Sequence, residues 1–200
     1  MIVVGRPLPR EELDPRAPAI REQRIFVRTL VGLAVPYLGI GYGAQLLASA
    51  MLGQLVEPPA KKLGAGEMKL TAAARTDKLL SGEPDSLPVV RWPAPSFSLP
   101  ERAVLLAGTS ESPDAFRLGE CAWGVLPHVE VTPEGFGDWV TETAIDGANP
   151  EVLVTELNRV REPRQQLAYR IMDRYLDRVT SFCHDEPPLV QLEDHSPRPE

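Results

Sequence analysis

The stretch that decides the fold is Val35-Pro36-Tyr37-Leu38-Gly39-Ile40-Gly41-Tyr42-Gly43-Ala44-Gln45-Leu46-Leu47. The apolar run from Val35 to Ile40 predicts a buried strand, and the small residues that follow predict a helix over 43–52. A strand that enters a helix through a tight glycine-flanked turn aims one side chain out of the bend, as in a nucleophile elbow. The residue at the apex of this turn is Gly41, which has no side chain. The sequence therefore predicts an active-site turn that lacks its nucleophile.

The rest of the chain alternates between predicted strands and helices. Helical spacing of apolar residues predicts a helix from Ala19 to Ala34, after a short β-branched strand at 1–4. Further strands are expected at 61–70 (a bent strand or hairpin), 87–91, 103–107, 115–118 and 122–126, and helices at 133–143 and 150–181, the last broken or kinked near Pro163. This order favours parallel pairing, because crossovers place helices on the sheet faces. We expect an α/β fold, a three-layer sandwich around a mostly parallel sheet.

The length and composition limit the classes of protein. Two hundred residues are enough for one sizeable core, and we expect a domain over 1–148, helices packed on it over 149–186 and a mobile tail over 187–200. The net charge of -7 disfavours nucleic acid and anionic membranes as partners. We expect no membrane-spanning segment, since no apolar run is long enough, and no secretory signal, since residues 1–6 lack a basic region followed by a long apolar one. Two cysteines build no disulfide framework, which together with these features predicts a cytoplasmic protein.

A second candidate feature is the pair His128 and Glu130, which follows the strand expected at 122–126. An imidazole with an orienting carboxylate is the arrangement of a general base. Residues two apart on a strand share a face, so we expect the two side chains to lie within hydrogen-bond distance and to face the turn at Gly41. The alternative is that His128 is an ordinary hydrogen-bonded histidine without a catalytic role.

The turn and the segment 124–130 together resemble the class I (triad) glutamine amidotransferases, in particular stand-alone proteins similar to the glutaminase domain of GMP synthase. The resemblance spans roughly residues 3–140 and includes weaker stretches at 59–64, 90–100 and 114–119. It implies a flavodoxin-like fold. In that family an elbow cysteine attacks the glutamine carboxamide, a histidine takes the proton and a glutamate orients the histidine. The cysteine position falls on Gly41 and the other two on His128 and Glu130, so the resemblance implies a chain that is not a glutaminase.

The resemblance also assigns a ligand pocket. The family's substrate-holding glutamine matches Gln45, and the backbone amides of its oxyanion hole match Gly5, Arg6 and Tyr42, although the family usually has two glycines where Arg6 stands. Arg91 lies in a pocket wall that departs from the family pattern at 93–95. It is a candidate for binding an anionic ligand, or else an ordinary surface arginine.

Other candidate groups are weaker. Cys121 precedes His128 by a stretch of strand too long for the two to meet and is expected to be a buried structural thiol. The segment Cys183-His184-Asp185-Glu186 resembles a metal site only in composition. We therefore predict no metal site and no cofactor.

Two hypotheses for function remain open. The first is a non-catalytic subunit that binds a small-molecule ligand or a synthase or ligase partner. The second is an enzyme of changed chemistry, in which His128 and Glu130 serve an elimination, cyclisation or hydrolysis in natural-product biosynthesis.

The resemblance starts late: relatives usually carry a strand, a helix and a second strand before the segment that matches 1–4, so the chain looks N-terminally shortened. Its first strand should then be a sheet edge with unpaired backbone groups. A homodimer or another partner could cover that edge. Alternatively, the C-terminal helix could fold back over it through Leu167, Ile171, Tyr175 and Val179.

Overall fold

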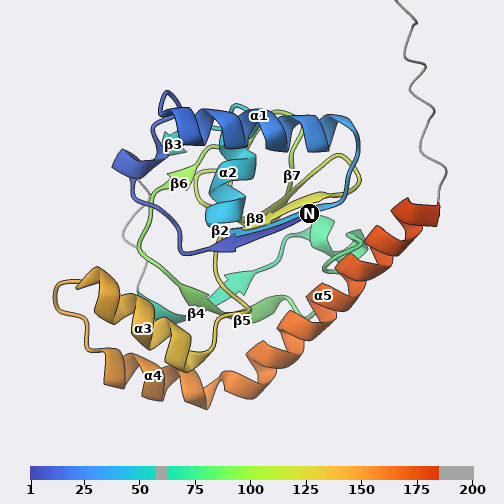
Figure 1. Ribbon diagram of the computed structural model, residues 1–200. Helices are drawn as coiled ribbons and strands as arrows, with labels where there is room; N and C mark the ends of the chain where they lie inside the picture. Colours follow the sequence, from blue (N-terminus) through green and yellow to red (C-terminus); the bar gives the residue numbers. More distant parts are fainter. Residues whose placement is uncertain (57–62, 185–200) are drawn as a thin grey trace, which may run out of the picture.

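A computed structural model describes residues 1–56 and 63–184 of the chain (Figure 1). Within these residues, five strands form the central sheet, in the order β1 (Ile2–Gly5), β2 (Tyr37–Gly41), β9 (Ala122–Val125), β8 (Pro113–Leu118) and β7 (Val104–Gly108). The pairs β1–β2 and β2–β9 are parallel, whereas β9–β8 and β8–β7 are antiparallel. The predicted α/β fold is confirmed, with a mixed sheet in which β8 alone runs against the other strands.

Helices cover one face of this sheet. There, α1 (Pro18–Gly32) and α2 (Tyr42–Ala50) bury a cluster of side chains that includes Val27, Tyr37, Leu47 and Phe116. Because burying each large apolar side chain contributes roughly 1.5–3 kcal/mol, this cluster fixes α2 firmly against the end of β2.

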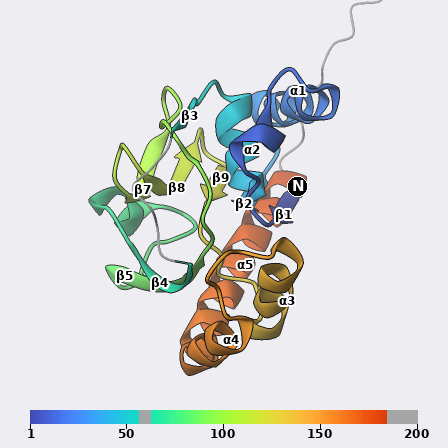
Figure 2. The same cartoon turned by 90° about the vertical axis from the view of Figure 1, so that its left-hand side faces the viewer.

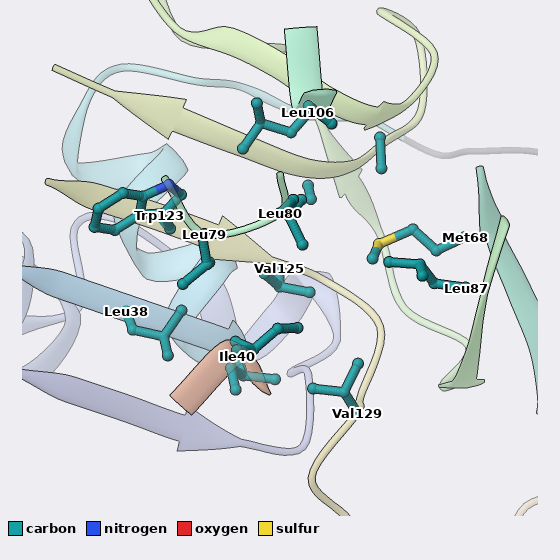
Figure 3. Close-up of a cluster of buried hydrophobic side chains, with 14 of the residues drawn as sticks. Leu38, Ile40, Met68, Leu79, Leu80, Leu87, Leu106, Trp123, Val125 and Val129 are labelled. Atoms are coloured by element: carbon teal, nitrogen blue, oxygen red, sulfur yellow. The ribbon is translucent and has the colours of Figure 1, made fainter. Parts of the chain in front are cut away.

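The opposite face is covered by α5 (Arg161–His184) together with the antiparallel pair of β4 (Gly64–Lys69) and β5 (Ser86–Arg91). Figure 3 shows side chains of this second core, with Ile40 of β2 next to Val129. Helices α1 and α2 on one face, and α5 with the β4–β5 pair on the other, give the three-layer arrangement predicted from the sequence.

The shorter elements connect these layers. They are η1 (Arg10–Leu13), β3 (Leu55–Val56), η2 (Ala72–Thr76), β6 (Ser96–Phe97), α3 (Pro133–Thr143) and α4 (Pro150–Arg159). Helix α3 begins as predicted, since the Thr132 side chain accepts a hydrogen bond from the Gly135 amide at 3.0 Å and Pro133 is in the first turn. A separate apolar cluster joins α3 and α4 to β4 and β5.

Two predicted elements differ from the structure in detail. The helical stretch from 150 is broken at Val160, between α4 and α5. Pro163 lies in the first turn of α5, where backbone N–H groups have no partner within the helix, so the proline costs no hydrogen bond. The strand expected at 61–70 is β4, which pairs with β5 instead of folding on itself, and neither strand joins the central sheet. Residues 59–62, Asp185, Glu186 and the tail expected to be mobile lie outside the described residues.

Strand β1 is an edge of the central sheet, as expected (Figure 2). Helix α5 contacts its start, because the Tyr175 hydroxyl lies 3.0 Å from the terminal ammonium of Met1 and 2.7 Å from the Met1 carbonyl oxygen. The helix nevertheless packs on the face of the sheet, and Ile2 and Val4 stay 40% and 46% exposed. Folding back of α5 therefore anchors the edge strand without covering it.

Candidate functional site

The turn predicted from the sequence joins β2 directly to α2 (Figure 1). All five residues of β2 are buried, and Gly41 ends the strand with φ 59° and ψ -111°. Residues with a side chain rarely adopt this left-handed conformation, whereas glycine adopts it freely. The backbone thus forms a sharp strand-to-helix bend of the kind that presents a nucleophile, with no side chain at its apex.

The space above Gly41 is filled. A Cβ atom built on Gly41 would lie 2.2 Å from the Gly5 carbonyl oxygen, and 2.4 Å and 2.7 Å from Cε1 and Nε2 of His128. Gly5 is the register partner of Gly41 across the β1–β2 pair, so its carbonyl cannot move away without disturbing the sheet. No side chain of any kind fits at the apex in this arrangement.

His128 and Glu130 lie together beside the turn. His128 Nδ1 is 2.6 Å from Glu130 Oε1, so the contact expected between the two side chains is confirmed. The reason for it differs from strand alternation: β9 ends at Val125, and the Glu130 carboxylate folds back so that its Oε2 also accepts the Val129 amide at 3.0 Å. A local bend, rather than an extended strand, brings the pair together.

The His128 ring is held rigidly and out of solvent. Its backbone exchanges two hydrogen bonds of 2.8 Å with Val90 of β5, and the side chain is fully buried. Its Nε2 atom, on the side of Gly41, has no hydrogen-bond partner among the described residues. This nitrogen faces the place where a nucleophile would stand, since a Cβ built on Gly41 would lie 2.7 Å from it.

Aromatic side chains wall off the histidine. The ring of Trp139, from α3, packs edge-on against His128 with 5.0 Å between centroids, and Trp92 packs against Trp139 at 6.1 Å. The Arg6 guanidinium lies over the Trp92 ring at 5.5 Å, a cation–π contact. Trp139 could not be singled out from the sequence, where it is one apolar residue of a predicted helix. Arg6, expected to contribute its backbone amide, contacts this wall through its side chain.

Gln45 is used within the fold. Its amide group accepts a hydrogen bond from the Leu8 amide at 2.9 Å and donates to the carbonyl oxygens of Leu8 and Pro95, at 3.1 Å and 3.3 Å. The side chain is 1% exposed. It ties the loop after β1 to the wall at 93–95, and these three bonds occupy its polar atoms.

Tyr42 and Arg91 also have partners elsewhere. The Tyr42 hydroxyl donates to Gln23 of α1 at 2.5 Å, and burial raises the pKa of this phenol. The Arg91 guanidinium forms a two-pronged ion pair with Asp114 at 2.8 Å and donates to the Glu67 carbonyl oxygen. Binding of an anionic ligand by Arg91 would have to displace Asp114.

Cys121 lies at the opposite end of the sheet from the turn. It precedes β9, next to the start of β2, and its Sγ donates to the Ala34 carbonyl oxygen at 2.9 Å. Burial raises the pKa of this thiol. It is a buried thiol remote from His128, and the turn itself has no sulfur.

Neither a cluster of metal-ligating side chains nor a membrane-spanning helix is present in the ranges 1–56 and 63–184. No three His, Cys, Asp or Glu side chains gather there in a way that could hold a metal ion. None of the helices in those ranges has the length and apolar character needed to cross a membrane.

Comparisons with known proteins agree with this fold. A glutamine amidotransferase from Thermotoga maritima superposes with a TM-score of 0.70 at 21% identity, over 88% of this chain and 78% of that one. A glutamine amidotransferase from Methylobacillus flagellatus superposes with a TM-score of 0.71 at 21% identity, over 86% and 73% of the two chains. The architecture is therefore that of the class I glutamine amidotransferases.

One curated protein is similar in sequence. GMP synthase [glutamine-hydrolyzing] of Leifsonia xyli subsp. xyli is 32% identical over an alignment of 123 residues that covers 58% of this chain and 24% of that protein. The chain thus spans about a quarter of the GMP synthase it resembles. No protein-family model matches the sequence. These findings support the resemblance to class I glutamine amidotransferases at the level of fold and partial sequence.

Proposed function

We propose that this chain is a class I glutamine amidotransferase-like protein in which Gly41 takes the place of the nucleophilic cysteine, and that it does not hydrolyse glutamine. Its role is that of a non-catalytic subunit that binds a ligand or a partner, in the cytoplasm and without a cofactor. The observation that carries this proposal is the closed apex: a side chain at Gly41 would meet the Gly5 carbonyl oxygen at 2.2 Å.

The chemistry follows from the atoms at the apex. Release of ammonia through an acyl intermediate requires a thiol or hydroxyl that attacks the carboxamide carbon, and glycine supplies neither. A water activated by His128 is disfavoured as a substitute, since the ring is fully buried and its Nε2 atom lies against the glycine backbone. Gln45, which would hold substrate in the family, is bonded to Leu8 and Pro95 instead.

Restoring the thiol alone should not restore activity. We expect Gly41→Cys to release ammonia from L-glutamine no faster than the double variant Gly41→Cys/His128→Ala, because the cysteine Cβ has no room and Gln45 stays engaged. Coupled detection of ammonia measures both rates. Circular dichroism of each variant controls for folding. Turnover by Gly41→Cys that His128→Ala abolishes would mean that the pocket is intact and that the loss rests on one residue.

We also propose that the partner binds along β1. The strand is paired on one side only in the described chain, and Ile2 and Val4 expose apolar side chains at 40% and 46%. Such an edge invites pairing with a strand of a second chain. The GMP synthase that this chain resembles is a synthase as well as a glutamine hydrolase by name, which favours a synthase or ligase partner.

In the absence of that partner, a twofold dimer through β1 is expected, because the same edge can pair with itself. Multi-angle light scattering over a concentration range measures the mass. Replacing Val4 with lysine should shift the population to monomer, and Leu52→Lys, a change at a 73% exposed leucine outside β1, is the matched control. A monomer at every concentration would contradict the dimer.

A second function is favoured by one observation, the 2.6 Å contact between His128 and Glu130. The pair could serve as base and orienter for a substrate other than glutamine. In that case any activity found with natural-product intermediates should be lost in His128→Ala while the fold is retained. A rate that His128→Ala leaves unchanged would leave only the binding role.

A further inference from the structure

A cavity lies behind the His128–Glu130 pair, between α5 and the segment that leads into α3. It has a volume of about 340 Å³, within the range of small-molecule sites. Its apolar lining includes Ile40 of β2 and Ala168, Ile171 and Met172 of α5. None of the residues that hold the apex at Gly41 closed, Gly5 and His128, lines it. The cavity is therefore distinct from the closed apex, and it borders the candidate site through Ile40, Val129 and Glu130.

One charged side chain in this lining is buried. Arg164 of α5 is 3% exposed, and its Nη1 donates to the Val131 carbonyl oxygen. Its Nε atom is buried and has no hydrogen-bond partner in the described part of the chain. Burial lowers the pKa of this guanidinium, and the nearby Glu130 opposes that shift without forming an ion pair with it. A buried cation with an unused donor is costly unless an acceptor meets it.

The other charged groups do not supply that acceptor. The Glu130 carboxylate is bonded to His128 through Oε1 and to the Val129 amide through Oε2. Arg161, at the rim of the cavity, pairs with Glu134 at 3.3 Å, and both side chains are at least half exposed. Arg164 is thus the buried cation of the lining, and no carboxylate of the described residues pairs with its guanidinium.

We propose that this cavity binds a small monocarboxylate with an apolar body, whose carboxylate pairs with Arg164 and whose body packs on Ala168, Ile171 and Met172. An anion is favoured over a neutral ligand because a charge-assisted bond to a buried guanidinium is roughly twice as strong as a neutral one. The volume leaves room for an aromatic ring or a short alkyl chain. This inference does not depend on Gly41.

The test uses 3-phenylpropanoate and its neutral isostere 3-phenylpropanamide as probes, with titration calorimetry on the full-length protein. The wild type should bind the carboxylate at least about tenfold more tightly than the amide. Arg164→Gln should remove this preference. Arg170→Gln, on the same helix but paired with Glu83 outside the cavity, is the matched control and should preserve it.

A further variant keeps the test valid if Arg164→Gln unfolds. Met172→Trp leaves Arg164 in place and fills the cavity, so both probes should lose binding. In the wild type, the carboxylate should also shift the ring resonances of His128, since Glu130 lines the cavity and is bonded to that ring. Equal affinities for carboxylate and amide, or no binding of either at about 10 mM, would overturn the proposal. These outcomes are independent of whether the protein hydrolyses glutamine.

Discussion

Replacing Gly41 with alanine should lower the free energy of unfolding by about 2–6 kcal/mol. The positive φ of 59° is one cause, since a strained backbone costs roughly 1–3 kcal/mol for a residue with a side chain. The other is overpacking, also about 1–3 kcal/mol, because the new methyl group would lie 2.2 Å from the Gly5 carbonyl oxygen. Urea denaturation of the wild type and the variant, followed by circular dichroism, measures the difference.

Gly119 provides a matched control. It has a similar φ of 56°, but no atom lies within 4 Å of the Cβ that alanine would add there. Gly119→Ala should therefore carry the backbone cost alone, roughly 1–2 kcal/mol. If both substitutions cost the same, the apex at Gly41 is open and a side chain fits there.

Replacing Asp77 with alanine should lower the free energy of unfolding by about 3–5 kcal/mol, the cost of removing one partner of a buried ion pair. Its carboxylate is 3% exposed and accepts hydrogen bonds from Arg117 Nε at 2.8 Å, Trp123 Nε1 at 3.0 Å and the Leu79 amide at 2.8 Å. The substitution leaves these buried donors without an acceptor under the β8–β9 face of the sheet.

The control is the exposed ion pair of Asp85 with Arg75, at 3.0 Å and with both side chains at least 70% exposed. Asp85→Ala should cost no more than about 1 kcal/mol, because water solvates both partners. Thermal and urea unfolding of the two variants should differ clearly. Similar losses would show that the Asp77 network contributes little.

The turn at Gly41 could be predicted from the sequence because its signals are local. An apolar run, glycines at 39, 41 and 43 and a helix-forming stretch all lie within a few residues. That β5 pairs with β4 and not with the central sheet could not be predicted. This pairing depends on contacts with α3, α4 and α5, which lie far from β5 in the sequence.

The site residues likewise could be predicted where the signal is local and could not where it depends on contacts distant in the sequence. The spacing of His128 and Glu130 predicts their contact, although a bend and not a strand produces it. The partners of Gln45 lie 37 and 50 residues away, so nothing near it in the sequence shows that its amide is already bonded. The buried Arg164 gave no signal either, because an arginine on an amphipathic helix is usually exposed.

Under the proposed function, the apex at Gly41 does not support hydrolysis of glutamine. The most direct measurement is ammonia release from L-glutamine by the purified wild-type protein, with His128→Ala as the matched control. The two proteins should give the same background rate, since no nucleophile stands at the turn for His128 to activate. Ammonia release by the wild type that is well above the rate of His128→Ala would contradict it.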